Sequence, residues 1–265
     1  MNRPDGLPDF GNPPLNEVVL GVQFEKHSGY NDLFAWRVRE ELKSEFPNYA
    51  EVPRLDPRFE VFGGAETLAN FQFSIQQSEP SKRYWFIATD DSHLVQFQDD
   101  RVLLNWRQRR DNEYPRYEAI VAKFGDLLEK LRAQFENDRQ QFVVNQAEIS
   151  YINVIPLVDS TTLGDWLKIV RPTALNIEQL NANFSEVVLS DDGNHPVARM
   201  HYEVSLFTAR EVKRAIRLVI TYRGAPREKH SSAIIDFLNA GRIRIVNRFC
   251  DITTEQAHKT WQRKQ

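Results

Sequence analysis

The chain has 265 residues, of which 41% are hydrophobic and 27% are charged, so it is too apolar for a disordered protein. Its 34 basic and 37 acidic side chains leave a net charge of −3, which argues against a general polyanion-binding protein. Cys250 is the single cysteine, which excludes an intramolecular disulfide and a cysteine-based zinc cluster.

The N-terminal stretch MNRPDGLPDFGNPP contains four prolines and no apolar core. It predicts an extended, poorly ordered lead-in over residues 1–14, and not a signal peptide. The sequence has no apolar run of about eighteen residues, the length that a membrane-spanning helix needs. We therefore expect a cytoplasmic protein that does not contact a membrane.

The first half begins with a strand, because apolar and polar residues alternate from Glu17 to Phe24. Asn31 is placed to cap a helix that runs to about Phe46 and ends before Pro47. Further strands are predicted near residues 59–62, 69–77 and 83–89.

A hairpin is predicted around Asp99-Asp100, because HLVQFQ precedes this pair and RVLLNW follows it. With a two-residue turn, Gln98 faces Arg101 and His93 faces Trp106. Residues that face each other share one side of a sheet, so the two strands agree on a single apolar face. That face carries Val95, Phe97, Val102, Leu104 and Trp106, and the other carries Gln96, Gln98, Arg101, Asn105 and Arg107, with Leu94 and Leu103 among them.

A long helix is predicted from Pro115 to about Arg139. Proline is favoured in a first helical turn, and apolar residues recur after it with helical spacing. The apolar stripe consists of Tyr117, Ile120, Val121, Phe124, Leu127, Leu128, Leu131 and Phe135.

The second half repeats this order of elements. We expect a strand near 146–156, a short helix near 161–170, strands near 183–189, 198–208 and 215–223, and a helical segment over about 231–262. Strand, helix, meander and long helix thus occur twice, over residues 15–140 and 141–265 of one globular domain. The two halves show no visible sequence identity, so whether they are a true duplication stays open. The pattern predicts an α+β fold: an open-faced antiparallel sheet with helices on one face and two pseudo-repeated halves.

The face of this sheet without helices is expected to be polar. Its amide, hydroxyl and guanidinium groups suit hydrogen bonding to a polar ligand, a peptide or a nucleic-acid backbone; alternatively, they are the ordinary polar cover of a half-exposed sheet. More arginines follow in NWRQRRDNEYPRYE (105–118), where they either grip phosphates or carboxylates or pair with the neighbouring acids. The candidate binding residues are Gln72, Gln96, Asn105, Arg107, Arg109, Arg110, Arg116, Arg199, His201 and Glu203.

Catalytic and metal-binding motifs are absent from the sequence. The six histidines form no HxxH, HExxH or HxH pair, and there is no GxSxG, GxxxxGK[ST] or GxGxxG. Cys250 lies in an apolar helical context, which indicates a buried, inert thiol. We therefore expect no catalytic residue, no metal and no cofactor.

In the C-terminal segment, Ile243, Val246 and Phe249 are spaced for a packed helix face. Thr253 or Thr254 is expected to cap a final turn that ends near Trp261. Three arginines fall outside the packed face and form either a solvated surface or a basic ridge that docks a partner: Arg242, Arg244 and Arg248.

Three motifs together resemble a sporadically distributed bacterial family of uncharacterised proteins: PPLNEVVLGVQFE, NWR followed by YPRYE, and the C-terminal FCDITT…W. The resemblance extends over nearly the whole chain and implies an accessory, horizontally moving gene, for instance in a defence or toxin–antitoxin setting. In that family an alanine–histidine pair commonly follows an aspartate in the last long helix. Here Asp236 is present but the corresponding pair is Ala240-Gly241, so any chemical role of that histidine is missing.

These features favour a non-enzymatic binding or regulatory protein that engages a protein partner, or a second copy of itself, through its open sheet face. The repeated unit is similar to the saddle of TATA-binding proteins, but a nucleic-acid partner is not favoured because the predicted face has few aromatic residues and the net charge is negative. The alternative is a phosphate-handling hydrolase or nuclease. Its groups would have to converge across the two halves: Arg107, Arg116, His201 and Glu203.

Overall fold

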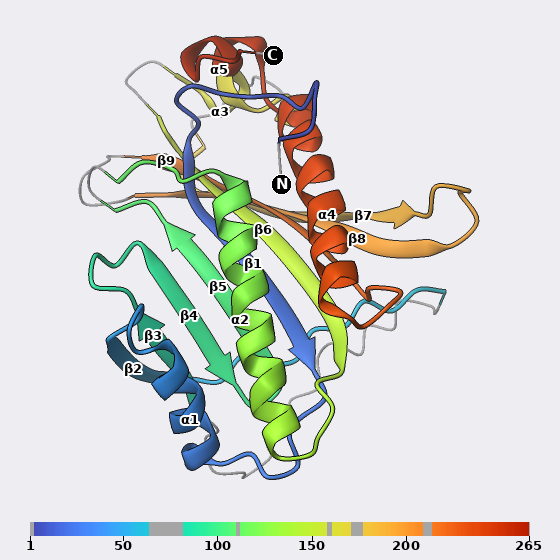
Figure 1. Ribbon diagram of the computed structural model, residues 1–265. Helices are drawn as coiled ribbons and strands as arrows, with labels where there is room; N and C mark the ends of the chain where they lie inside the picture. Colours follow the sequence, from blue (N-terminus) through green and yellow to red (C-terminus); the bar gives the residue numbers. More distant parts are fainter. Residues whose placement is uncertain are drawn as a thin grey trace.

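The computed structural model describes residues 3–63, 82–109, 112–157, 161–170, 177–208 and 214–264. The predicted strand at 69–77 and the candidates Gln72 and Arg110 lie outside these residues. The described residues form nine strands and five helices (Figure 1). These are β1 (Leu15–Phe24), α1 (Asp32–Leu42), β2 (Asn48–Pro53), β3 (Lys82–Ile87), β4 (His93–Gln98), β5 (Arg101–Arg107), α2 (Tyr117–Asn137), β6 (Val144–Pro156), α3 (Leu163–Trp166), β7 (Asn181–Leu189), β8 (Pro196–Phe207), β9 (Ala215–Gly224), α4 (Ser231–Ile252) and α5 (Glu255–Thr260).

All nine strands form one antiparallel sheet, in the order β2-β3-β4-β5-β1-β6-β9-β8-β7. The long helices α2 and α4 pack on the same face of it (Figure 1). Apolar and polar residues alternate along the strands, so the apolar residues gather on one face and the helices cover it. In β1, Val18, Leu20 and Val22 are all fully buried on this helix side. The predicted α+β fold with an open-faced antiparallel sheet is confirmed. We call the opposite side the polar face.

The repeated order of elements is visible in the sheet. β1 and β6 pair at the centre, with Leu20 opposite Ile149. Outward from this pair, the first half runs β1-β5-β4-β3 and the second runs β6-β9-β8-β7, so equivalent strands take equivalent places. The first half adds β2 as an outer strand.

The predicted hairpin is confirmed with its register, because Gln98 pairs with Arg101 and His93 with Trp106. Its apolar face is completely buried against the helices. The predicted stripe of α2 is also confirmed, and all eight of its residues are buried. The helix begins at Tyr117, two residues after Pro115, because Arg116 adopts a left-handed φ of 71° that no helical residue has.

Two strand predictions differ from the structure. Residues 59–62 are not a strand, because the chain after β2 binds side chains of the polar face instead of pairing with a neighbouring strand. β2 itself was not predicted; it is an outer strand that follows Pro47 and ends at Pro53, and its alternation is weak. The C-terminal segment is two helices, α4 and α5, and Thr254 caps α5 by accepting from the Ala257 N–H as expected.

The described part of the N-terminal lead-in, residues 3–14, packs against the C-terminal segment through Phe10. Phe10 is buried among Phe249, His258 and Trp261, and its backbone bridges to Arg263. An aromatic cluster of this kind repays the ordering of an extended segment that the composition alone does not favour. No helix in the part of the chain that the structure describes is long and apolar enough to cross a membrane.

Helix α4 buries Phe249 and partly buries Val246 as predicted, but it differs from the prediction at two residues. Arg242 is 3% exposed and Ile243 is 36% exposed, the reverse of the expectation. Gly241 gives the physical reason: a Cβ there would lie 2.5 Å from Cδ1 of Tyr222 and 2.7 Å from Cγ2 of Ile149, so the missing side chain lets α4 approach the sheet.

Candidate functional site

The predicted polar face is largely closed in the first half. Gln96 and Asn105 are buried, and Gln96 Nε2 donates to Asn105 Oδ1 at 2.8 Å. Asn105 Nδ2 in turn donates to Glu17 Oε1 at 2.6 Å. These amides satisfy each other inside the protein, so they are structural and not an exposed binding surface.

The segment that directly follows β2, residues 54–61, crosses the polar face. We call it the strap. The N–H of Leu55 donates to Gln98 Oε1 at 3.0 Å, and the N–H of Arg58 donates to Gln23 Oε1 at 2.7 Å. Arg101 Nη2 donates to the carbonyl of Asp56 at 3.0 Å. The strap therefore satisfies the polar groups of β4, β5 and β1 in turn.

The strap ends on β8, at two of the predicted site residues. Its buried Glu60 accepts from Arg199 Nε at 2.9 Å and lies 2.6 Å from His201 Nε2 and 3.3 Å from Arg223 Nη1. Burial alone would raise the pKa of Glu60, but hydrogen bonds with His201 and Arg199 and the charge of Arg223 hold it below its usual value. Arg199 and His201 thus anchor the strap.

The remaining candidates are held in separate ion pairs. Arg107 and Arg109 both bind Asp91, the latter at 2.7 Å. Arg116 binds Asp9 at 2.8 Å, and Glu203 lies 3.6 Å from Arg217.

The four groups of the hydrolase alternative do not converge. Arg107 in β5 and Glu203 in β8 are separated by four strand spacings, roughly 19 Å at about 4.8 Å each. Within the described ranges, no group of three or more histidine, cysteine, aspartate and glutamate side chains is placed to hold a metal ion.

The sheet edge at β7 is a surface that the sequence did not single out. β7 is the last strand of the sheet, and no described residue pairs with its outer side. The N–H of Leu206 donates to the carbonyl of Leu180, which lies directly opposite it. Hydrogen-bonded pairs alternate along an antiparallel ladder, so every second residue of β7 turns its backbone outward. These are Asn181, Asn183, Ser185 and Val187.

Large apolar side chains accompany this outer backbone. Phe184 is 42% exposed, Val187 is 44% exposed and Leu189 is 46% exposed. Phe184 lies on the helix side, stacked 4.6 Å from the ring of Tyr202, whereas Val187 lies on the polar face opposite Arg199. Apolar residues on both faces of one strand are the signal that the sequence did offer.

A groove of about 480 Å³ runs between β7 and α4. Figure 1 shows β7 and β8 extending past α4 on this side. One wall is fixed by Arg248, whose guanidinium binds Glu186 at 2.8 and 3.0 Å. Burial favours a raised pKa for Glu186, but hydrogen bonds from Arg248 and Tyr202 hold it lower than usual. The groove also presents the polar side chains of Asp191, Arg244, Asn247 and Asp251.

Comparisons of the chain with protein-family models, with curated proteins and with solved structures find no match.

Proposed function

We propose that this protein is a non-enzymatic binding protein that holds an extended segment of a partner protein along the outer edge of β7. The observation that carries this proposal is a nine-residue outer strand whose outward backbone groups meet no other described strand. Such a row of N–H and C=O groups is a template for one more strand.

The side chains around the edge indicate which kind of segment fits. An added strand would lie about 4.8 Å from β7 and place its alternate side chains beside Val187 on one face and Phe184 on the other. The exposed apolar surface of both residues favours a segment with apolar side chains. Beyond Phe184, the groove beside α4 offers both charges, through Arg244 and Asp251, to polar side chains of the partner.

The partner is thus expected at the edge of the sheet and not on its open face. The face is unsuitable where the strap and the buried amides fill it. The accessory bacterial setting implied by the sequence resemblance is consistent with a protein that acts by binding another gene product.

Proline substitution tests the proposal. Ser185→Pro removes an outward N–H and no hydrogen bond to β8, so the protein should fold while an added strand loses a bond and meets a steric block. Tagged wild-type protein is used to capture partners from its native host, and each captured protein is then tested with purified Ser185→Pro and with Ser185→Ala, which keeps the N–H. We expect Ser185→Pro to weaken binding at least about tenfold and Ser185→Ala to leave it unchanged.

Two outcomes would contradict the proposal. Equal binding by wild type and Ser185→Pro would place the partner elsewhere on the molecule. A wild-type dimer that Ser185→Pro converts to a monomer, with no other protein bound, would make the edge a contact between copies of this chain.

A further inference from the structure

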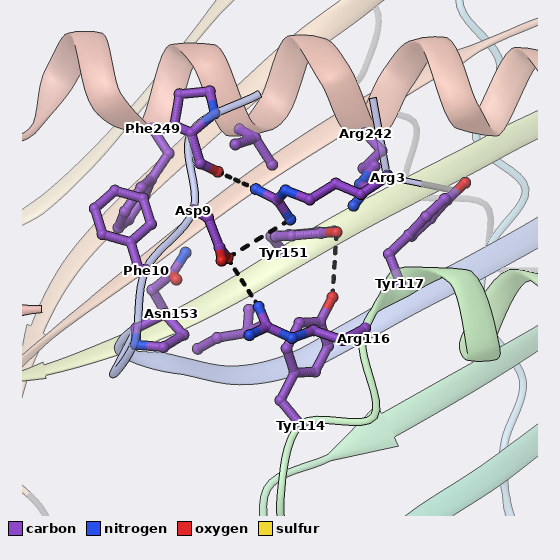
Figure 2. Close-up of a pocket in the computed structure, with 14 residues that line it drawn as sticks. Arg3, Asp9, Phe10, Tyr114, Arg116, Tyr117, Tyr151, Asn153, Arg242 and Phe249 are labelled. Carbon is purple, nitrogen blue, oxygen red and sulfur yellow. Dashed lines mark hydrogen bonds and ion pairs between the residues drawn. The ribbon is translucent and has the colours of Figure 1, made fainter. Parts of the chain in front are cut away.

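A pocket of about 60 Å³ lies on the helix side of the sheet, away from β7. Figure 2 shows it enclosed by the N-terminal segment, by the residues around the start of α2, by β6 and by α4. We infer that this pocket binds a small organic acid, with the carboxylate held by arginine and tyrosine side chains and the apolar body held against an apolar wall. The side chains that carry the inference are Arg3, Asp9, Tyr114, Arg116, Tyr151 and Arg242.

Arg242 supplies a buried positive charge. Its side chain is only 4% exposed, its Nη2 lies 2.9 Å from Glu118 Oε1, and its guanidinium lies 4.7 Å from the centre of the Tyr117 ring. A buried guanidinium is costly unless it is paired and hydrogen-bonded, and it presents five N–H donors. The carboxylate of Glu118 does not use all of these donors, so Arg242 can also bind a second carboxylate.

Two tyrosine hydroxyls add neutral donors. The oxygens of Tyr114 and Tyr151 lie 3.5 Å apart, at the outer limit of a hydrogen bond. Burial raises the pKa of Tyr114 well above its usual value, and it also raises the pKa of Tyr151, so both hydroxyls keep their protons. A carboxylate placed between them would receive two shorter hydrogen bonds than the one they share now.

The N-terminal segment already places a carboxylate here. Asp9 Oδ1 lies 2.8 Å from Arg116 Nη1 and 3.6 Å from Arg3 Nη1, and Oδ2 lies 4.0 Å from Lys264 Nζ (Figure 2 shows the two arginines). Lys264 does not line the pocket, so the pocket sets three arginines, Arg3, Arg116 and Arg242, against the carboxylates of Asp9 and Glu118. The excess of one positive charge favours a further anion, and Asp9 competes with it for Arg3 and Arg116.

The size and the wall of the pocket limit the ligand. At about 10–15 Å³ for each water-sized position, the volume holds roughly four to six non-hydrogen atoms. Leu15, Val246 and Phe249 form an apolar wall, which suits a short hydrocarbon chain better than a phosphate. The expected ligand is therefore a short-chain monocarboxylate, and butyrate is a suitable probe.

Calorimetric titration with butyrate and with butyramide tests this site, because the amide has the same shape and no charge. Wild type should bind butyrate and not butyramide. Arg116→Gln should weaken butyrate binding about tenfold, whereas Asp9→Asn should strengthen it, because it removes the competing carboxylate. Arg227→Gln, at an exposed arginine that pairs with His195 outside the pocket, is the matched control and should change nothing.

Arg116→Gln and Asp9→Asn should change the butyrate affinity in opposite directions. A loss of structure would weaken binding in both variants, so this result cannot come from misfolding. Equal binding of butyrate and butyramide would overturn the inference, as would the absence of butyrate binding in both wild type and Asp9→Asn. Weakening of similar size in Asp9→Asn and Arg116→Gln would also overturn it. The pocket shares no residue with β7, so Ser185→Pro should leave the butyrate affinity unchanged whether or not β7 binds a partner.

Discussion

The two edges of the sheet are protected very differently. β2 has six residues, follows Pro47, ends at Pro53, and carries Glu51 in an ion pair of 3.0 Å with Lys82. β7 has nine residues and no proline, and its one charged residue, Glu186, is bound to Arg248 on the helix side. Short length, proline and charge are the usual means by which proteins prevent edge pairing. β2 has all three and β7 has none at its outer side.

The exposed apolar residues of the two edges differ in the same way. Tyr49 of β2 is 48% exposed, but its ring packs 5.2 Å from that of Trp36 and 4.9 Å from the guanidinium of Arg39. Val187 and Leu189 of β7 have similar exposure, at 44% and 46%. One edge is covered by its own side chains, and the other pairs with no described strand on its outer side.

The largest expected effect is on the free energy of unfolding, and it tests the register of β7. The Glu186 N–H faces β8, so Glu186→Pro should lower the free energy of unfolding by about 2 kcal/mol or more, whereas Ser185→Pro should lower it by less than about 1 kcal/mol. Chemical denaturation of both variants measures the difference. Equal losses would mean that the outward and inward positions have been exchanged.

The strap covers part of the polar face and is held there by Glu60. Glu60→Gln leaves Arg199, Arg223 and His201 without their carboxylate partner and should cost about 2 kcal/mol at neutral pH. The folded-state pKa of Glu60 lies below its ordinary value of 4.5, so its contribution is complete above about pH 4.5 and is lost as the pH falls through the folded-state pKa. The stability difference between wild type and Glu60→Gln should therefore shrink as the pH falls below about 4.5. A difference that is constant over this range would contradict the account of Glu60.

A matched pair of lysine substitutions compares the edges directly. Val187→Lys should weaken partner binding about tenfold, because a charge replaces an apolar contact next to the added strand. Tyr49→Lys, at a residue of similar exposure on β2, should leave partner binding unchanged. Binding constants for the purified partner provide the measurement, and weaker binding with Tyr49→Lys alone would reverse the assignment of the two edges.

Local patterns predicted the parts of the fold that depend on neighbouring residues. The β4–β5 register followed from a two-residue turn and two strands whose apolar positions agree, and α2 followed from one stripe of helical period. Arg242 could not be placed in this way. Its inward position depends on the close approach of Gly241 to Tyr222 and on an ion pair with Glu118. Both partners lie outside α4, so the spacing of residues along this helix does not reveal them.

The candidate site depended on contacts that are distant in sequence. Alternation placed Asn105, Arg199 and His201 on the polar face correctly, but it could not show that Glu60, 139 and 141 residues before the latter two, would bind them. The edge position of β7 likewise depends on the order of strands in the sheet, which alternation within a strand does not determine. The apolar residues on both of its faces were the available hint.

Amide hydrogen exchange along β7, measured by NMR with and without the captured partner, tests the central claim most directly. The account predicts fast exchange at Asn183, Ser185 and Val187 in the free protein and strong protection of these amides in the complex. Phe184 and Glu186, whose N–H groups face β8, should be protected in both states. Exchange at Asn183, Ser185 and Val187 that is unchanged by a bound partner would contradict the proposal that β7 receives a strand.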